Sequence, residues 1–131
     1  MRTRAAGDSQ INPRSFEGVL AAFVLELRAR WYSKAMVKHA HTTLGRFFAY
    51  LGGRRIRDLR AVDEAEVFAY ARQLAEAKSA ATGERYSPAT QRTHLYLVKR
   101  LFRFLLRAGV VLQDPTLNLQ VPVWSSTRAP S

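Results

Sequence analysis

The residues best suited to chemistry lie in the stretch 87–107, where hydrogen-bonding and cationic side chains recur at helical spacing. Ser87 and Thr90 stand at its start, where their hydroxyls and the first amide groups of a helix favour a phosphate oxygen. Gln91, Arg92 and His94 follow, and amide and guanidinium groups form paired hydrogen bonds with base edges. Thr90 is expected to reach base edges with Gln91 and His94. The outward stripe continues through Lys99, Arg103 and Arg107.

A second set of polar residues lies in the predicted helix after Ser33. Lys34, Lys38 and His41 share the face opposite the apolar residues, and Arg46 flanks them. Between Leu27 and Arg57 the chain has eight Lys or Arg residues and no acid. Gly45 lies on the same face. Glycine inside a helix costs about 1 kcal/mol relative to alanine, so Gly45 suggests close approach of another backbone, with a neighbouring helix favoured over DNA.

The net charge points to a polyanionic partner. The 131 residues include 21 Lys and Arg against 10 Asp and Glu, which gives +11 at pH 7. Such an excess is typical of proteins that bind nucleic acid or an anionic surface. The predicted third helix differs, because its acids outnumber its bases; its charged residues are Asp63, Glu64, Glu66, Arg72, Glu76 and Lys78. We therefore expect the second and fourth helices to face phosphate and the third to face away.

Several classes of protein are disfavoured by what the sequence lacks. It has no cysteine, which excludes disulfides and thiolate metal sites. His39 and His41 point apart on a helix, and no carboxylate joins them at ligand spacing, so no metal or cofactor is expected. There is no apolar run of the roughly 18 residues that a membrane span needs and no secretion signal. The sequence thus predicts a cytoplasmic protein with no membrane contact and no small-molecule substrate.

Four segments with apolar residues at helical spacing predict an all-α, compact four-helix bundle. Each segment follows a residue that favours the N-cap position, and glycines mark two of the ends. The predicted caps are Ser15, Ser33, Asp63 and Ser87, and the predicted stops are Gly52-Gly53 and Gly109. The fourth helix is expected over residues 88–108. Ser87 can equally act only as this cap, with no role in phosphate binding.

The distribution of helical signals divides the chain into three parts. Residues 1–14 are polar and are expected to form a loose leader. Residues 15–113 carry the four helices and form the predicted domain. Residues 114–131 contain three prolines and no periodicity, so they are expected to be an extended tail.

The stretch from Ser87 to Pro122 also resembles the N-terminal core-binding domain of tyrosine recombinases, the phage-integrase and Xer-type family. The matching residues, in order, are Ser87, Thr90, Leu95, Phe102, Phe104, Leu105, Gly109, Asp114-Pro115 and Pro122. A weaker match extends upstream to about Phe16. The chain departs from the family pattern at Asp114, where asparagine is commoner, and at Val37, where threonine is usual.

The resemblance implies a SAM-like helical domain that clamps double-stranded DNA against a second, catalytic domain. That second domain carries the family's Arg, Lys, His and Tyr residues, which are absent from this chain. The resemblance therefore implies that this polypeptide binds and positions a recombination site without catalysis, and contacts other recombinase subunits in a synaptic complex. The predicted tail would be the start of the linker between the domains.

Two other functions remain open on the sequence. The domain can be a stand-alone helical DNA-binding regulator, although the loop before the fourth helix is longer than a helix-turn-helix motif uses. It can instead be a protein-interaction module whose basic face meets an acidic partner. A basic helix face is also often only solvated surface.

Overall fold

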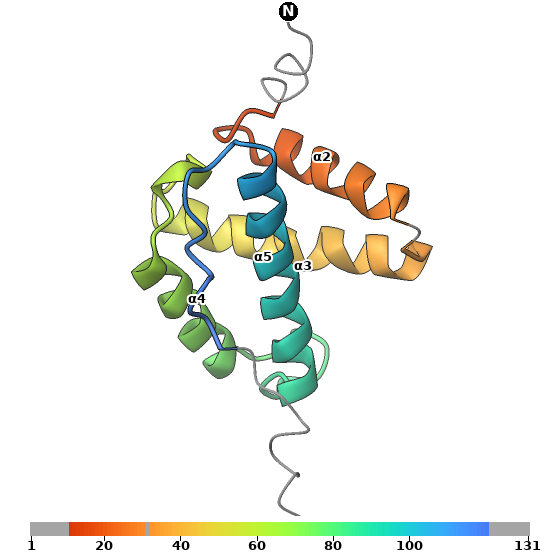
Figure 1. Cartoon of the computed structure of the whole chain (residues 1–131). Helices are drawn as coiled ribbons and strands as arrows, with labels where there is room; N and C mark the ends of the chain where they lie inside the picture. Colours follow the sequence, from red (N-terminus) through yellow and green to blue (C-terminus); the bar gives the residue numbers. More distant parts are fainter. Residues whose placement is uncertain (1–10, 31, 121–131) are drawn as a thin grey trace, which may run out of the picture.

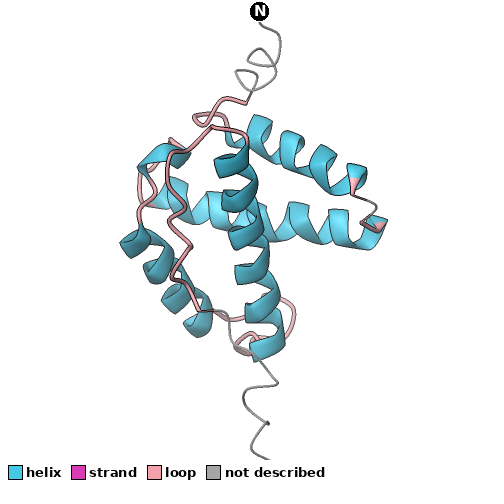
Figure 2. Ribbon diagram, in the orientation of Figure 1, coloured by secondary structure: helices cyan, strands magenta, loops and turns pink. Residues whose placement is uncertain are grey.

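The computed structural model describes residues 11–30 and 32–120, and this part of the chain is all-α (Figures 1 and 2). Its elements are α2 (Phe16–Ala29), α3 (Lys34–Gly53), the 3-10 turn η1 (Leu59–Ala61), α4 (Glu64–Glu76) and α5 (Pro88–Arg107). Apart from an isolated bridge between Lys78 and Arg85, the described residues form no strand. The predicted four-helix, all-α architecture is confirmed.

The four helices begin at the residues that the sequence predicted as caps. The side chains of Ser15, Ser33, Asp63 and Ser87 each accept a hydrogen bond from the backbone amide three residues on. Each bond satisfies one of the amides that a helix start leaves without a partner. At the other end of α5, Gly109 has φ +76, a left-handed conformation that glycine adopts without strain.

The core forms where α3 and α5 cross. α3 contacts both α2 and α5, and α4 packs on α5. The Phe47 ring lies at the centre, 6.1 Å from the Phe102 ring and 5.0 Å from the Tyr70 ring between centroids. All three residues are completely or almost completely buried. Because these rings come from α3, α4 and α5, their packing fixes the crossing of the helices that carry the candidate site.

The segment after α5 is folded back on the helices, which corrects the prediction of an extended tail. Thr116 and Leu119 are buried, and the Lys99 ammonium donates hydrogen bonds to their carbonyl oxygens at 2.8 and 3.0 Å. Asp114 closes the turn by accepting from the Thr116 amide at 2.8 Å. Figure 1 shows this segment, in blue, running back past α5. The folded domain thus reaches at least Leu119, while the rest of the predicted tail, 121–131, lies outside the described residues.

Part of the predicted leader also belongs to the folded domain. Ile11 packs against the core, and the Pro13 carbonyl accepts a hydrogen bond from the Leu59 amide at 3.0 Å. Residues 1–10 lie outside the described part of the chain. No helix in the described part has the length and apolarity needed to cross a membrane.

Candidate nucleic-acid interface

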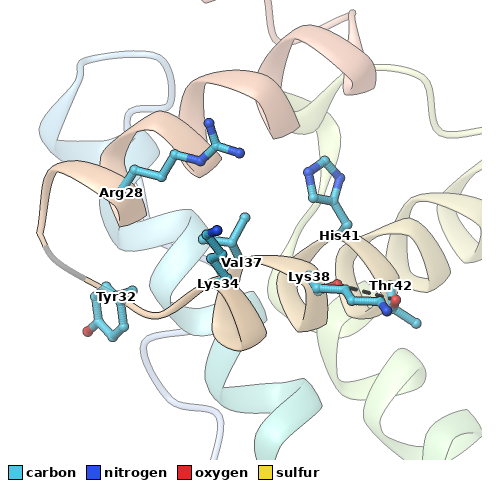
Figure 3. A pocket seen from close by; sticks show the side chains of 7 residues that line it. All are labelled: Arg28, Tyr32, Lys34, Val37, Lys38, His41 and Thr42. Atoms are coloured by element: carbon cyan, nitrogen blue, oxygen red, sulfur yellow. Dashed lines mark hydrogen bonds between the residues drawn. The ribbon is translucent and has the colours of Figure 1, made fainter.

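A basic groove of about 770 Å³ lies where α2 ends and α3 begins (Figure 3). Its lining is largely apolar in area, with cationic and hydroxyl groups among the side chains that form it. The lining residues are Arg28, Tyr32, Lys34, Val37, Lys38, His41 and Thr42. No carboxylate lines it. A concave, acid-free surface of this kind attracts an anion more strongly than isolated surface cations do.

The start of α3 positions the groove residues. Ser33 caps the helix by accepting a hydrogen bond from the Met36 amide at 3.1 Å. Lys34, Lys38 and His41 follow at spacings of four and three, so they share one face and are exposed. Val37 is 7% exposed and forms the floor between them. The structure therefore brings these three sequence-predicted site residues together.

The groove cations keep their charge available for a ligand. The five ion pairs among the described residues use Glu26, Asp58, Glu66 and Glu76, and none of them includes Arg28, Lys34 or Lys38. Thr42 donates to the Lys38 carbonyl at 3.3 Å, the contact drawn in Figure 3. An anion entering the groove would displace water rather than a competing carboxylate.

Arg46 connects the groove to the start of α5. It lies one turn beyond Thr42 on α3 and is half-buried. Its guanidinium group stacks 5.2 Å from the centroid of the Tyr86 ring, and its Nη1 donates to the Tyr86 hydroxyl at 3.5 Å. Because Tyr86 directly precedes the cap residue Ser87, the basic face of α3 continues to the N-terminus of α5.

Gly45 contradicts the expectation that a neighbouring helix packs against it. It is exposed, and a methyl group built at this position would meet no atom within 4 Å. The backbone of α3 is therefore open to solvent beside His41. The α2 and α5 helices pack on other faces of α3, where its apolar residues lie.

The polar residues at the start of α5 are used in local structure. Ser87 Oγ accepts from the Thr90 amide and donates to Thr90 Oγ1, both at 3.1 Å. The Gln91 side-chain amide donates to the Tyr86 carbonyl at 3.0 Å. Ser87 is exposed at this helix start, and Arg92 is half-buried. In this arrangement Gln91 is directed back to the loop and does not point outward to a base.

His94 is not on the outer surface, which corrects its prediction as a residue that reaches base edges. It is 7% exposed, with its ring 5.5 Å from Tyr86 and 6.3 Å from His39 between centroids. Burial, together with the neighbouring Arg46 and His39, lowers the pKa of His94 to about 4. His94 is buried because it lies on α5 four residues before the buried Val98, and this spacing places it on the apolar face of the helix.

The surroundings of Arg46 are polar and contain neutral groups. Tyr70 has a buried hydroxyl without a hydrogen-bond partner, and burial raises its pKa to about 12 in spite of the nearby Arg46. Arg46 Nε and Thr43 Oγ1 are also buried without a partner among the described residues. The positive charge of Arg46 is thus not cancelled by an acid, which keeps the potential at the crossing of α3 and α5 positive.

The two remaining predicted residues lie elsewhere on α5. Lys99 is half-buried and holds the carbonyls of Thr116 and Leu119, so its predicted contact with DNA is replaced by a structural one. Arg103 is exposed, but it lines a second hollow between α5 and α2 and is not part of the groove. The predicted outward stripe of α5 is therefore not one surface.

Besides the apolar Val37, three lining residues of the groove were not among the predicted site residues: Arg28, Tyr32 and Thr42. Arg28 carried a signal, because it opens the acid-free run that ends at Arg57. Thr42 carried one too, because it follows Lys38 by four residues and flanks the basic face of the predicted helix. Tyr32 carried none, since its place in the groove depends on how α2 and α3 pack.

The described residues contain no group of three or more His, Cys, Asp or Glu side chains that could hold a metal ion. Comparisons of the chain with protein-family models, curated proteins and solved structures found no match.

Proposed function

We propose that this chain is a DNA-binding domain of the core-binding type found in tyrosine recombinases and integrases. In this role it holds duplex DNA at a recombination site, carries no catalytic residues of its own, and works beside other recombinase subunits. The observation that supports the proposal best is the acid-free groove at the start of α3, with Arg28, Lys34 and Lys38 outside every ion pair of the described chain.

The groove residues bind the sugar-phosphate backbone in this proposal. Lys34 and Lys38 neutralise phosphates, and Thr42 and His41 add hydrogen bonds to phosphate oxygens. Arg46 extends the contact toward Ser87 and the positive end of the α5 dipole. Contacts of this kind position a protein on DNA and carry little sequence information, so we expect the isolated domain to bind duplexes of different sequence with similar affinity.

The test is fluorescence anisotropy with a labelled duplex of about 30 base pairs at several salt concentrations. Neutralising three phosphates gives a slope of log K against log salt of about −3. Lys38→Glu should lower the affinity at least about tenfold and reduce the slope by about one. The matched control is Arg72→Glu, which makes the same change in charge at an exposed site on α4 and should leave the slope unchanged.

Two results would contradict the proposal. Absence of duplex binding at low salt would remove DNA as the partner. Equal weakening by Lys38→Glu and Arg72→Glu would mean that only net charge attracts DNA and that the groove has no special role. Either result would favour an acidic protein as the partner of the basic face.

A further inference from the structure

A second hollow, of about 200 Å³, lies between α2 and α5 and is separate from the groove. Phe23 and Phe104 form its apolar side, with ring centroids 5.7 Å apart. The polar side consists of Glu26 and the four arginines Arg30, Arg100, Arg103 and Arg107. Tyr32 separates the two hollows, since it lines the groove while the Arg100 guanidinium lies 5.0 Å from its ring centroid.

The charges around this hollow do not balance. Four arginines and one glutamate line the hollow, which leaves three positive charges in excess. One oxygen of Glu26, Oε2, accepts from both Arg30 Nε at 2.5 Å and Arg107 Nη2 at 2.9 Å. Arg103 is exposed and forms no ion pair with a described residue. Like charges brought together in this way repel one another unless an anion joins them.

Arg100 is held in place before any ligand binds. Its guanidinium lies 5.0 Å from the Tyr32 ring centroid and 5.7 Å from that of Tyr96. Its Nη1 donates to the Tyr96 hydroxyl at 3.3 Å, and its Nε is buried without a partner. A guanidinium fixed by two aromatic rings loses little conformational freedom when it binds an anion.

We propose that the hollow between α2 and α5 binds a phosphate group. Arginine binds phosphate oxygens in pairs, and the excess of three positive charges favours an anion over a neutral ligand. A free phosphate or pyrophosphate with two or more negative charges matches this excess better than a DNA phosphodiester, which has one. The volume equals that of several water molecules at about 30 Å³ each, which is enough for a phosphate group. The phosphate comes either from a free oxyanion such as pyrophosphate or from a DNA backbone, and only the second source rests on the proposed function.

The first experiment titrates the whole chain with inorganic pyrophosphate at constant ionic strength, followed by the NMR signals of the arginine Nε–H groups. We expect saturable shifts of Arg100 and Arg103. Arg103→Gln should weaken binding about tenfold, the equivalent of one lost charge-assisted hydrogen bond. Arg72→Gln on α4 is the matched control and should leave the affinity unchanged. Circular dichroism verifies that each variant is folded.

A substitution that is expected to tighten binding distinguishes a direct effect on the site from a loss of structure. Glu26→Gln removes the one carboxylate of the hollow and releases Arg30 and Arg107, so it should tighten pyrophosphate binding. Non-saturable shifts, equal binding by Arg103→Gln and wild type, or weaker binding by Glu26→Gln would each overturn the proposal.

Duplex binding by the same variants identifies the source of the phosphate. If it comes from DNA, Arg103→Gln lowers the duplex affinity and the salt slope by about one, and pyrophosphate competes with the duplex. If it is a free oxyanion, Arg103→Gln weakens pyrophosphate binding while its duplex affinity stays at the wild-type value. Pyrophosphate binding without any duplex binding would contradict the proposed function but still support this phosphate site.

Discussion

The basic residues of α3 and those of α5 have opposite surroundings. On α3, Lys34 and Lys38 are exposed in a groove that no carboxylate lines. On α5, Lys99 holds two backbone carbonyls, Arg100 lies between two tyrosine rings, and Arg107 pairs with Glu26. Both helices carry cations at helical spacing along one face, yet on α5 most of those charges have partners within the domain.

This difference shows that cationic spacing on a helix does not by itself define a binding face. A lysine stem is long enough to cross the helix surface and reach a neighbouring segment. On α5 that segment is the turn around Thr116, whereas the groove side of α3 has no covering segment among the described residues. The consequence is that equal substitutions on the two helices should have unequal effects on stability and on DNA binding.

The largest expected effect is that of Lys99→Met, which removes the two hydrogen bonds to the Thr116 and Leu119 carbonyls. The substitution takes a charged donor away from both carbonyls. Because Thr116 and Leu119 are buried, water does not readily replace that donor, and we expect the free energy of unfolding to fall by about 3 to 4 kcal/mol. Urea denaturation at neutral pH measures this change.

The matched control is Lys38→Met, at an exposed position of α3. It should change stability by less than about 0.5 kcal/mol and should lower duplex affinity instead. If Lys99→Met were as stable as wild type, the contact with the turn would contribute nothing, and Lys99 would again be available to a ligand.

The second effect concerns His94, whose pKa is lowered to about 4 by burial and by Arg46 and His39. The unfolded chain, with a histidine pKa of about 6.5, binds a proton in the range where the folded chain does not. Stability from this group is therefore complete above about pH 6.5 and is lost as the pH falls toward 4.

Between about pH 7.5 and pH 4.5 this loss should amount to about 2 to 3 kcal/mol. Urea denaturation of wild type and His94→Leu at both pH values isolates it, because other titrating groups affect both proteins alike. An equal pH dependence in the two proteins would show that the pKa of His94 is not lowered by folding.

Two substitutions of Ser87 distinguish its role as the cap of α5 from a role in phosphate binding. Ser87→Ala should lower stability by about 1 kcal/mol, since it removes the cap of α5. Ser87→Asp keeps the cap and favours the helix dipole, so its stability should match wild type. Its negative charge should nevertheless weaken duplex binding if phosphate approaches the start of α5. Unchanged duplex binding by Ser87→Asp would restrict the DNA contact to the groove of α3.

The smallest expected effect is that of Gly45→Ala. The site is exposed, and the added methyl group meets nothing within 4 Å, so helix propensity alone should raise stability by just under 1 kcal/mol. Thermal unfolding measures the gain. A loss of stability would show that another part of the chain packs here. Weaker duplex binding by this more stable variant would place DNA against the backbone of α3.

The sequence predicted three of the seven residues that line the groove, for reasons that are local. Lys34, Lys38 and His41 lie on one helix, and their spacing alone puts them on one face. The prediction for His94 failed because its hydrogen-bonding capacity was given more weight than its spacing from Val98 and Leu101, which places it on the buried face. The prediction for Lys99 failed for another reason: its partners lie 17 and 20 residues further along the chain, and no local pattern predicts that contact.

By itself the sequence determined the helices of this protein, their four N-caps and the apolar faces that form the core, because these depend on contacts within a few residues. It also determined the excess of positive charge. Only the tertiary structure decided where that charge is available. The packing of α2 on α3 encloses the groove, and the crossing of α3 and α5 buries His94 and places Arg46 against Tyr86. The segment after α5 folds back, and its carbonyl groups accept hydrogen bonds from Lys99. Each of these depends on the distance between segments remote in sequence, which composition and periodicity do not specify.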